Sequence, residues 1–165
     1  MQLKEKLVQL VEYKRWANQL TFAALGELPT EELVKPRPTR FGNMLHTLNH
    51  VYVIDDIFKA HLLSQPHIYT ERNTVSHPPL ETLQQQQEQM DLWYLDYIET
   101  LEESFLSDII EFRFVDGKEG EMTRSDIILH VVNHGTYHRG FVADMMYQVP
   151  ATPPANDLTV YLQNL

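Results

Sequence analysis

Apolar residues recur at steps of three and four positions along four long segments of the chain. This spacing places them on one face of an α-helix, so it predicts four amphipathic helices. The predicted helices cover approximately residues 3–25, 43–63 and 80–105, and a fourth segment from 123 or 125 to 147. Gly26 and Pro29 end the first helix, and Ser125 is the predicted N-cap of the fourth.

A short β element is predicted between the third and fourth helices. Residues 109–115 alternate in part between apolar and polar side chains, and Asp116-Gly117 is a turn signal. Long helices with one minor β element indicate an all-α four-helix bundle with a short β-hairpin before the last long helix. Residues 26–42 and 64–79 are too long for tight turns, which predicts one or more crossover connections. The length of 165 residues favours one domain, residues 1–165.

The charge balance and the absence of cysteine exclude several classes of function. The chain has 23 acidic and 13 basic residues, a net charge of −10, which argues against nucleic acid or an anionic membrane as a partner. It has no cysteine, which excludes disulfides, cysteine-ligated metals and a cysteine nucleophile. No apolar run approaches the roughly 20 residues of a membrane span, and no secretory signal is present. We therefore expect a cytoplasmic protein.

Five of the eight histidines form two helical ladders. His46 and His50 are four residues apart in the second predicted helix, and His130, His134 and His138 follow the same step in the fourth. Residues four apart lie on one face of a helix. Two imidazoles on adjacent turns can bind one metal ion, and a third from a facing helix completes a three-nitrogen site. Three protein ligands with one open position are typical of catalytic zinc.

A second interpretation of the histidines is a buried hydrogen-bonded network without metal. The ladder faces also carry apolar residues, such as Ile54 beside His50 and Val142 beside His138, and a buried imidazole needs a polar partner or an ion. Spacing alone leaves both interpretations open. If a metal binds, all-imidazole ligation favours zinc, nickel, copper or iron over calcium and magnesium. The absence of His-Glu-x-x-His and Glu-x-x-His argues against a zincin and a ferritin-like di-iron site.

Several motifs occur together in the order found in one known family. They are the Y-x-x-W-A-N stretch at 13–18, Thr47-Leu48-Asn49-His50, the N-H-x-x-x-H-R-G stretch at 133–140, and Pro153-Pro154 with Asp157-Leu158. In these motifs the chain resembles the DinB/YfiT-like family of small four-helix-bundle metalloproteins. The resemblance spans almost the whole chain, and the N-H-x-x-x-H-R-G stretch is its most specific part.

The resemblance implies a divalent metal held by His50, His134 and His138. Nickel and zinc are the metals it favours, with iron, manganese and copper as alternatives. His46 is then either a further ligand or exposed, and His130 is a core residue or a neighbour of the ligands. The family commonly has glutamine where this chain has Phe141, so we expect a more apolar pocket here.

Characterised relatives imply one of two enzymatic activities. These are metal-dependent hydrolysis and transfer of a low-molecular-weight thiol to an electrophile, each with a small-molecule substrate. Because the chain has no cysteine, a thiol must come from a cosubstrate. The sequence identifies no general base. The alternatives are a bundle that binds a metal or small molecule without catalysis, and a bundle whose histidines are merely buried. The family also suggests a homodimer.

Overall fold

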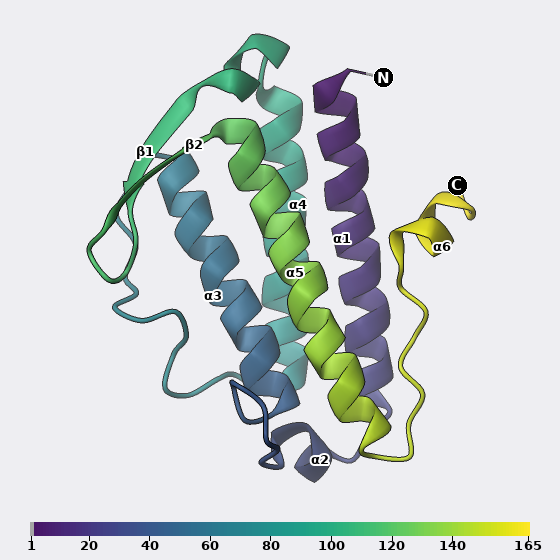
Figure 1. Ribbon diagram of the computed structural model, residues 1–165. Helices are drawn as coiled ribbons and strands as arrows, with labels where there is room; N and C mark the ends of the chain where they lie inside the picture. The colour runs from purple at the N-terminus through teal and green to yellow at the C-terminus, as the bar shows by residue number, and fades with distance from the viewer. Residues whose placement is uncertain (1) are drawn as a thin grey trace.

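The computed structural model describes residues 2–165 and consists mainly of four long helices packed as a bundle (Figure 1). The long helices are α1 (Leu3–Gly26), α3 (Met44–Leu62), α4 (Leu80–Thr100) and α5 (Arg124–Tyr147). Two short helices, α2 (Thr30–Val34) and α6 (Leu158–Leu162), lie outside the bundle, and a 3₁₀ helix, η1, covers Glu103–Ser107. The prediction of an all-α four-helix bundle is confirmed.

The order of the helices around the bundle places α3 opposite α1. Helix α3 packs against α4 and α5, and α1 packs against the same two helices. The α3/α5 seam and the α1/α4 seam are therefore on opposite sides of the bundle. Helices α3 and α4 run in the same direction, so residues 63–79 cross over the length of the bundle (Figure 1). This is one of the two long connections for which a crossover was predicted.

Polar side chains set the starts of the two helices that carry the histidines. The Asn43 side chain accepts a hydrogen bond of 2.7 Å from the backbone N–H of His46 at the start of α3. At the start of α5, the Thr123 hydroxyl accepts one of 3.1 Å from the N–H of Asp126. Such caps satisfy backbone donors that have no partner within the helix. The prediction of Ser125 as N-cap was therefore wrong, because this residue lies inside the first turn.

The third predicted helix was also too long at its C-terminal end. Helix α4 ends at Thr100, and Leu101 takes an extended backbone with ψ of 143°. The chain then re-enters a separate turn, η1, which buries Leu106 at 1% exposure. The prediction extended too far because η1 also packs on the bundle, so the apolar residues of 101–106 continue the spacing of the helix. Helices α2 and α6 were not predicted, since five residues are too few to show a helical period.

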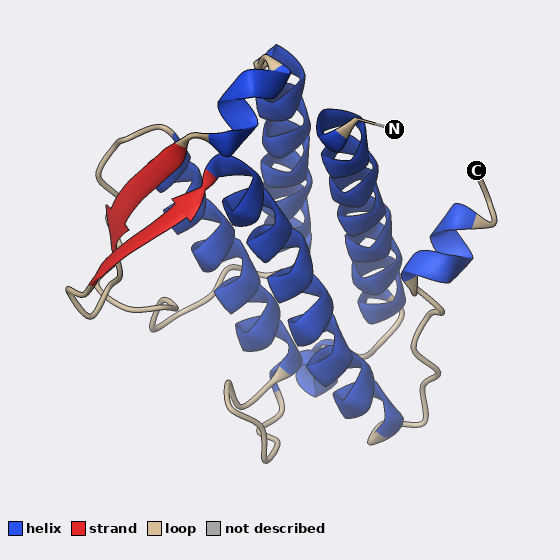
Figure 2. Ribbon diagram, turned by 45° about the horizontal axis from the view of Figure 1, so that its top comes forward, coloured by secondary structure: helices blue, strands red, loops and turns tan. Residues whose placement is uncertain are grey.

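The predicted β element is a two-stranded antiparallel hairpin. Strand β1 (Ile109–Arg113) pairs with β2 (Glu119–Thr123), and Gly117 in the turn has φ of +85°. Ile110 and Phe112 face the core, and the hairpin lies against α3 and α5 (Figure 2). None of the helices within residues 2–165 is long and apolar enough to cross a membrane.

Candidate metal centre

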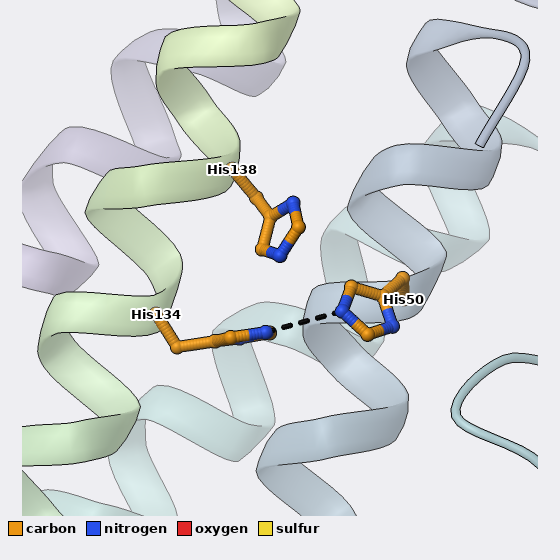
Figure 3. Close-up of side chains that lie close together, drawn as sticks. All are labelled: His50, His134 and His138. Atoms are coloured by element: carbon orange, nitrogen blue, oxygen red, sulfur yellow. Dashed lines mark hydrogen bonds between the residues drawn. The ribbon is translucent and has the colours of Figure 1, made fainter. Parts of the chain in front are cut away.

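Three histidines meet across the seam between α3 and α5. His50 comes from α3, and His134 and His138 come from successive turns of α5 (Figure 3). One ring nitrogen of each lies within 4.8 Å of the others, and the Nε2 atoms of His50 and His134 are 3.1 Å apart. Two imidazole nitrogens on one tetrahedral zinc, each at about 2.0–2.1 Å, would be about 3.3 Å apart. The nitrogens of His50 and His134 are therefore already at the separation of two ligands on one ion, and a nitrogen of His138 lies within 4.8 Å of both.

A backbone carbonyl orients the His50 ring. The Nδ1 atom of His50 lies 2.6 Å from the carbonyl oxygen of Arg72, in the crossover between α3 and α4. Because a carbonyl oxygen only accepts, Nδ1 donates the proton and Nε2 presents its lone pair to His134 and His138. This is the usual arrangement of metal-binding histidines, whose second nitrogen donates to a carbonyl or carboxylate.

Burial keeps the three imidazoles neutral. It is the main cause that lowers the pKa of His134 to about 2, and the charges of His138 and His50 lower it further. Burial also lowers the pKa of His138 to about 4, with a contribution from His50. The pKa of His50 is lowered mainly by burial, and the positive charges of Arg40 and Arg72 act in the same direction. Neutral imidazole is the form that binds metal, so no proton has to leave at pH 7.

The two remaining ladder histidines lie outside this set. His46 is half-buried, and its ring centre is 6.0 Å from that of His77. His130 packs on Phe58, with 4.7 Å between ring centres. In the part of the chain that the structure describes, no fourth histidine, aspartate or glutamate joins the three. The cluster of described residues therefore offers three imidazole nitrogens and no carboxylate.

Aromatic side chains surround the histidines. Phe41 stacks on His50 with ring centres 4.2 Å apart and lies 5.6 Å from His138. Phe141 is 5.9 Å from the His138 ring and is 37% exposed. This position beside His138 agrees with the expectation of a more apolar pocket from phenylalanine at position 141. Together with Tyr137, 5.0 Å from His138, these rings make the surroundings of the centre apolar on this side.

The sequence did not indicate the role of Arg72. It is 22 residues from His50 along the chain and acts through its backbone carbonyl, which every residue has. Asn49 is the residue from which this contact could have been inferred. Its side chain donates hydrogen bonds to the side chains of Asn73 and Thr74, the two residues after Arg72, at 2.5 and 2.7 Å. The asparagine next to His50 thus holds the loop whose carbonyl orients the His50 ring.

Comparison with known proteins gives consistent results for family and fold. The DinB family matches residues 1–164. The chain is 29% identical over 160 residues to Protein DinB of Bacillus subtilis (strain 168), covering 93% of this chain and 92% of that protein. It also resembles the crystal structure of a DinB-like protein from Bacillus cereus ATCC 10987, with a TM-score of 0.66 and 18% identity over 92% of this chain and 95% of that one. At this identity, the structural likeness shows the fold alone.

Proposed function

The chain belongs to the DinB family, and on that premise we propose that it is a metal-dependent enzyme whose ion is held by His50, His134 and His138. The observation that carries the proposal is the convergence of three neutral imidazoles with no fourth histidine, aspartate or glutamate beside them among residues 2–165. A structural zinc site would be closed by a fourth ligand, whereas a catalytic site keeps a position for water or substrate.

The donor set favours nickel or zinc, with iron, manganese and copper as alternatives. When bound at such a site, a divalent metal lowers the pKa of a coordinated water or thiol and polarises a carbonyl group. These properties suit hydrolysis of a small molecule or transfer of a low-molecular-weight thiol, which a cosubstrate must supply. The residues of this chain contribute ligand orientation, through the bond from His50 to Arg72, and shielding from water, through Phe41 and Phe141.

Elemental analysis of untagged protein tests the metal centre. We expect about one metal per chain in the wild type and its loss in His50→Ala, His134→Ala and His138→Ala. His46→Ala is the matched control, because it removes a histidine of the same ladder that lies outside the cluster, and it should keep the metal. Wild-type protein that holds no metal after incubation with zinc or nickel would contradict the proposal.

Turnover assays on the metal-loaded protein then test catalysis. We expect activity with either hydrolase substrates or a thiol and an electrophile, and its loss in His134→Ala. Stoichiometric metal without turnover in either class would instead support a non-catalytic binding protein. The homodimer implied by the family resemblance stays a prediction, which sedimentation of the metal-loaded protein tests.

A further inference from the structure

A cavity of about 640 Å³ lies beside the three histidines, where three connections meet. Its walls come from Arg40 and Phe41 before α3, His46 in the first turn of α3, residues 70–75 of the crossover, and Val115 and Asp116 at the tip of the hairpin. Two of these wall residues also contact the metal centre: Phe41 stacks on His50, and the Arg72 carbonyl accepts its Nδ1 proton. The cavity and the centre are therefore neighbours that share residues. Its volume is within the range of small-molecule sites.

Over residues 2–165, the guanidinium groups of two arginines of this cavity form no ion pair and no hydrogen bond. The chain has seven arginines. Five of them hold an ion pair or a side-chain hydrogen bond within the protein: Arg15, Arg37, Arg113, Arg124 and Arg139. Over residues 2–165, Arg40 and Arg72 are the two whose guanidinium groups have neither, and both line the cavity. In a chain with a net charge of −10, two free guanidiniums at one cavity form a local positive site.

The acidic residues of the cavity do not cancel this charge. Asp116 accepts hydrogen bonds from the Lys118 ammonium at 2.8 Å and from the Lys118 backbone N–H at 3.2 Å. Its carboxylate is therefore already paired with one cation; the hydrogen bonds from Lys118 lower its pKa, and the positive charge of Arg72 adds to this. Glu71 is the other carboxylate of the wall. Two guanidiniums thus face one uncommitted carboxylate.

We propose that Arg40 and Arg72 bind an anionic group, a carboxylate or a phosphate, of the small molecule on which the metal centre acts. That this molecule is a substrate rests on the proposed function. The anion site itself does not depend on it. Guanidinium presents a planar fork of donors that matches both anions. Phe41, which stacks on His50 and has the Arg40 guanidinium 5.8 Å from its ring centre, gives the cavity an apolar wall, which suits a molecule with an anionic end and an apolar part.

Titration calorimetry of zinc-loaded protein tests the anion site. The probes are succinate and inorganic phosphate, with uncharged succinamide as the matched neutral compound. We expect at least one anion to bind and succinamide not to bind. Arg40→Gln and Arg72→Gln should each weaken anion binding about tenfold, since each removes a charge-assisted contact. Comparison of succinate with phosphate identifies which anion the site prefers.

The control variant is Arg15→Gln. Arg15 pairs with Glu88 between α1 and α4, on the opposite side of the bundle, so this change removes one positive charge without touching the cavity. Anion binding should be unchanged in it. If neither anion binds the wild type, or if binding is equally strong in the Arg40→Gln/Arg72→Gln double variant, the inference is wrong.

Metal content of every titrated sample separates this inference from the proposed function. Samples that keep the metal but bind anions independently of the arginines would overturn the anion site and leave the metal centre standing. Metal-free protein that still binds an anion through Arg40 and Arg72 would support the anion site, even if the proposal of a metal enzyme failed.

Discussion

His61, near the end of α3, is a titratable side chain inside the apolar core. It is 9% exposed and stacks on Phe112, with ring centres 4.7 Å apart, while His67 faces it at 5.5 Å. Burial, followed by the charge of His67, lowers the pKa of His61 to about 4. In the unfolded chain its pKa is about 6.5. Between these values the unfolded chain binds a proton that the native protein does not, so stability falls as the pH falls from about 6.5 to about 4.

Replacement of His61 by phenylalanine should flatten this pH dependence. His61→Phe keeps an aromatic ring against Phe112 and removes the titrating nitrogen. We expect the loss of unfolding free energy between about pH 7.5 and pH 5 to be about 1–2 kcal/mol smaller in the variant. Urea denaturation of both metal-free proteins at pH 7.5 and pH 5 measures these losses. The difference between the two proteins at pH 7.5, where His61 is neutral in both states, reports the effect of the substitution on packing. Equal losses in both proteins would show that His61 is protonated in the native state.

At the same scale, the sequence predicted which three histidines lie together better than it predicted their surroundings. Helical spacing placed His134 and His138 on one face, and the family resemblance selected His50 from its own ladder. Spacing could not choose between His50 and His46, because the two lie four residues apart on one face of the same helix. Only the packing of α3 against α5 brings His50, and not His46, close to His134 and His138. The carbonyl of Arg72 gave no signal, since its position depends on the path of a loop.

At the scale of elements, a buried layer of charge connects all four long helices. Lys14 of α1 forms ion pairs with Asp55 of α3, at 2.8 Å, and with Asp91 of α4. Asn18 of α1 donates to Asp91 at 2.7 Å and accepts from Arg139 of α5 at 2.9 Å. Lys14, Asp55 and Asp91 are at most 1% exposed. Because Asp55 follows His50 by five residues and Arg139 follows His138 directly, this layer lies close to the metal centre in both helices.

Removal of the lysine alone should be strongly destabilising. Lys14→Met leaves two buried carboxylates without their cation, which typically costs about 3–5 kcal/mol. The double variant Lys14→Met/Asp55→Asn removes one charge of each sign and leaves Asp91 to balance the buried Arg139, and we expect it to recover at least half of that loss. Urea denaturation at neutral pH compares the two with the wild type. A Lys14→Met protein as stable as the wild type would mean that the layer contributes little to folding.

The four long helices could be predicted because their apolar faces repeat over many turns. The ends of the helices and the short elements could not, since caps and 3₁₀ turns depend on a few local hydrogen bonds, as Thr123 and Leu101 show. The buried charges were also not predictable. Lys14 is 41 residues from Asp55 and 77 from Asp91, and the three pair with one another only in the folded bundle.

For the whole molecule, the important feature is that the centre is assembled from parts distant in sequence. The three clustered histidines come from α3 and α5, and the crossover returns along the bundle to place Arg72 beside His50. A hydrogen bond of 2.8 Å from Tyr69 to Asp56 holds the same crossover on α3. The length of this connection predicted a crossover, but its path depends on these tertiary contacts. A metal at this seam would therefore join helices that separate on unfolding.

Metal binding should accordingly stabilise the native protein by mass action. A ligand that binds only the folded state adds about 2.7 kcal/mol at a free concentration 100 times its Kd, which for a chain of this size corresponds to a rise in Tm of roughly 5–10 °C. We expect this rise on adding zinc to metal-free wild type and to His46→Ala, and its reversal by a chelator. His134→Ala should show no rise, whatever its own Tm, because the measured quantity is the shift and not the starting stability. A shift of the same size in His134→Ala would place the zinc elsewhere on the molecule and remove the basis for a metal centre at the α3/α5 seam.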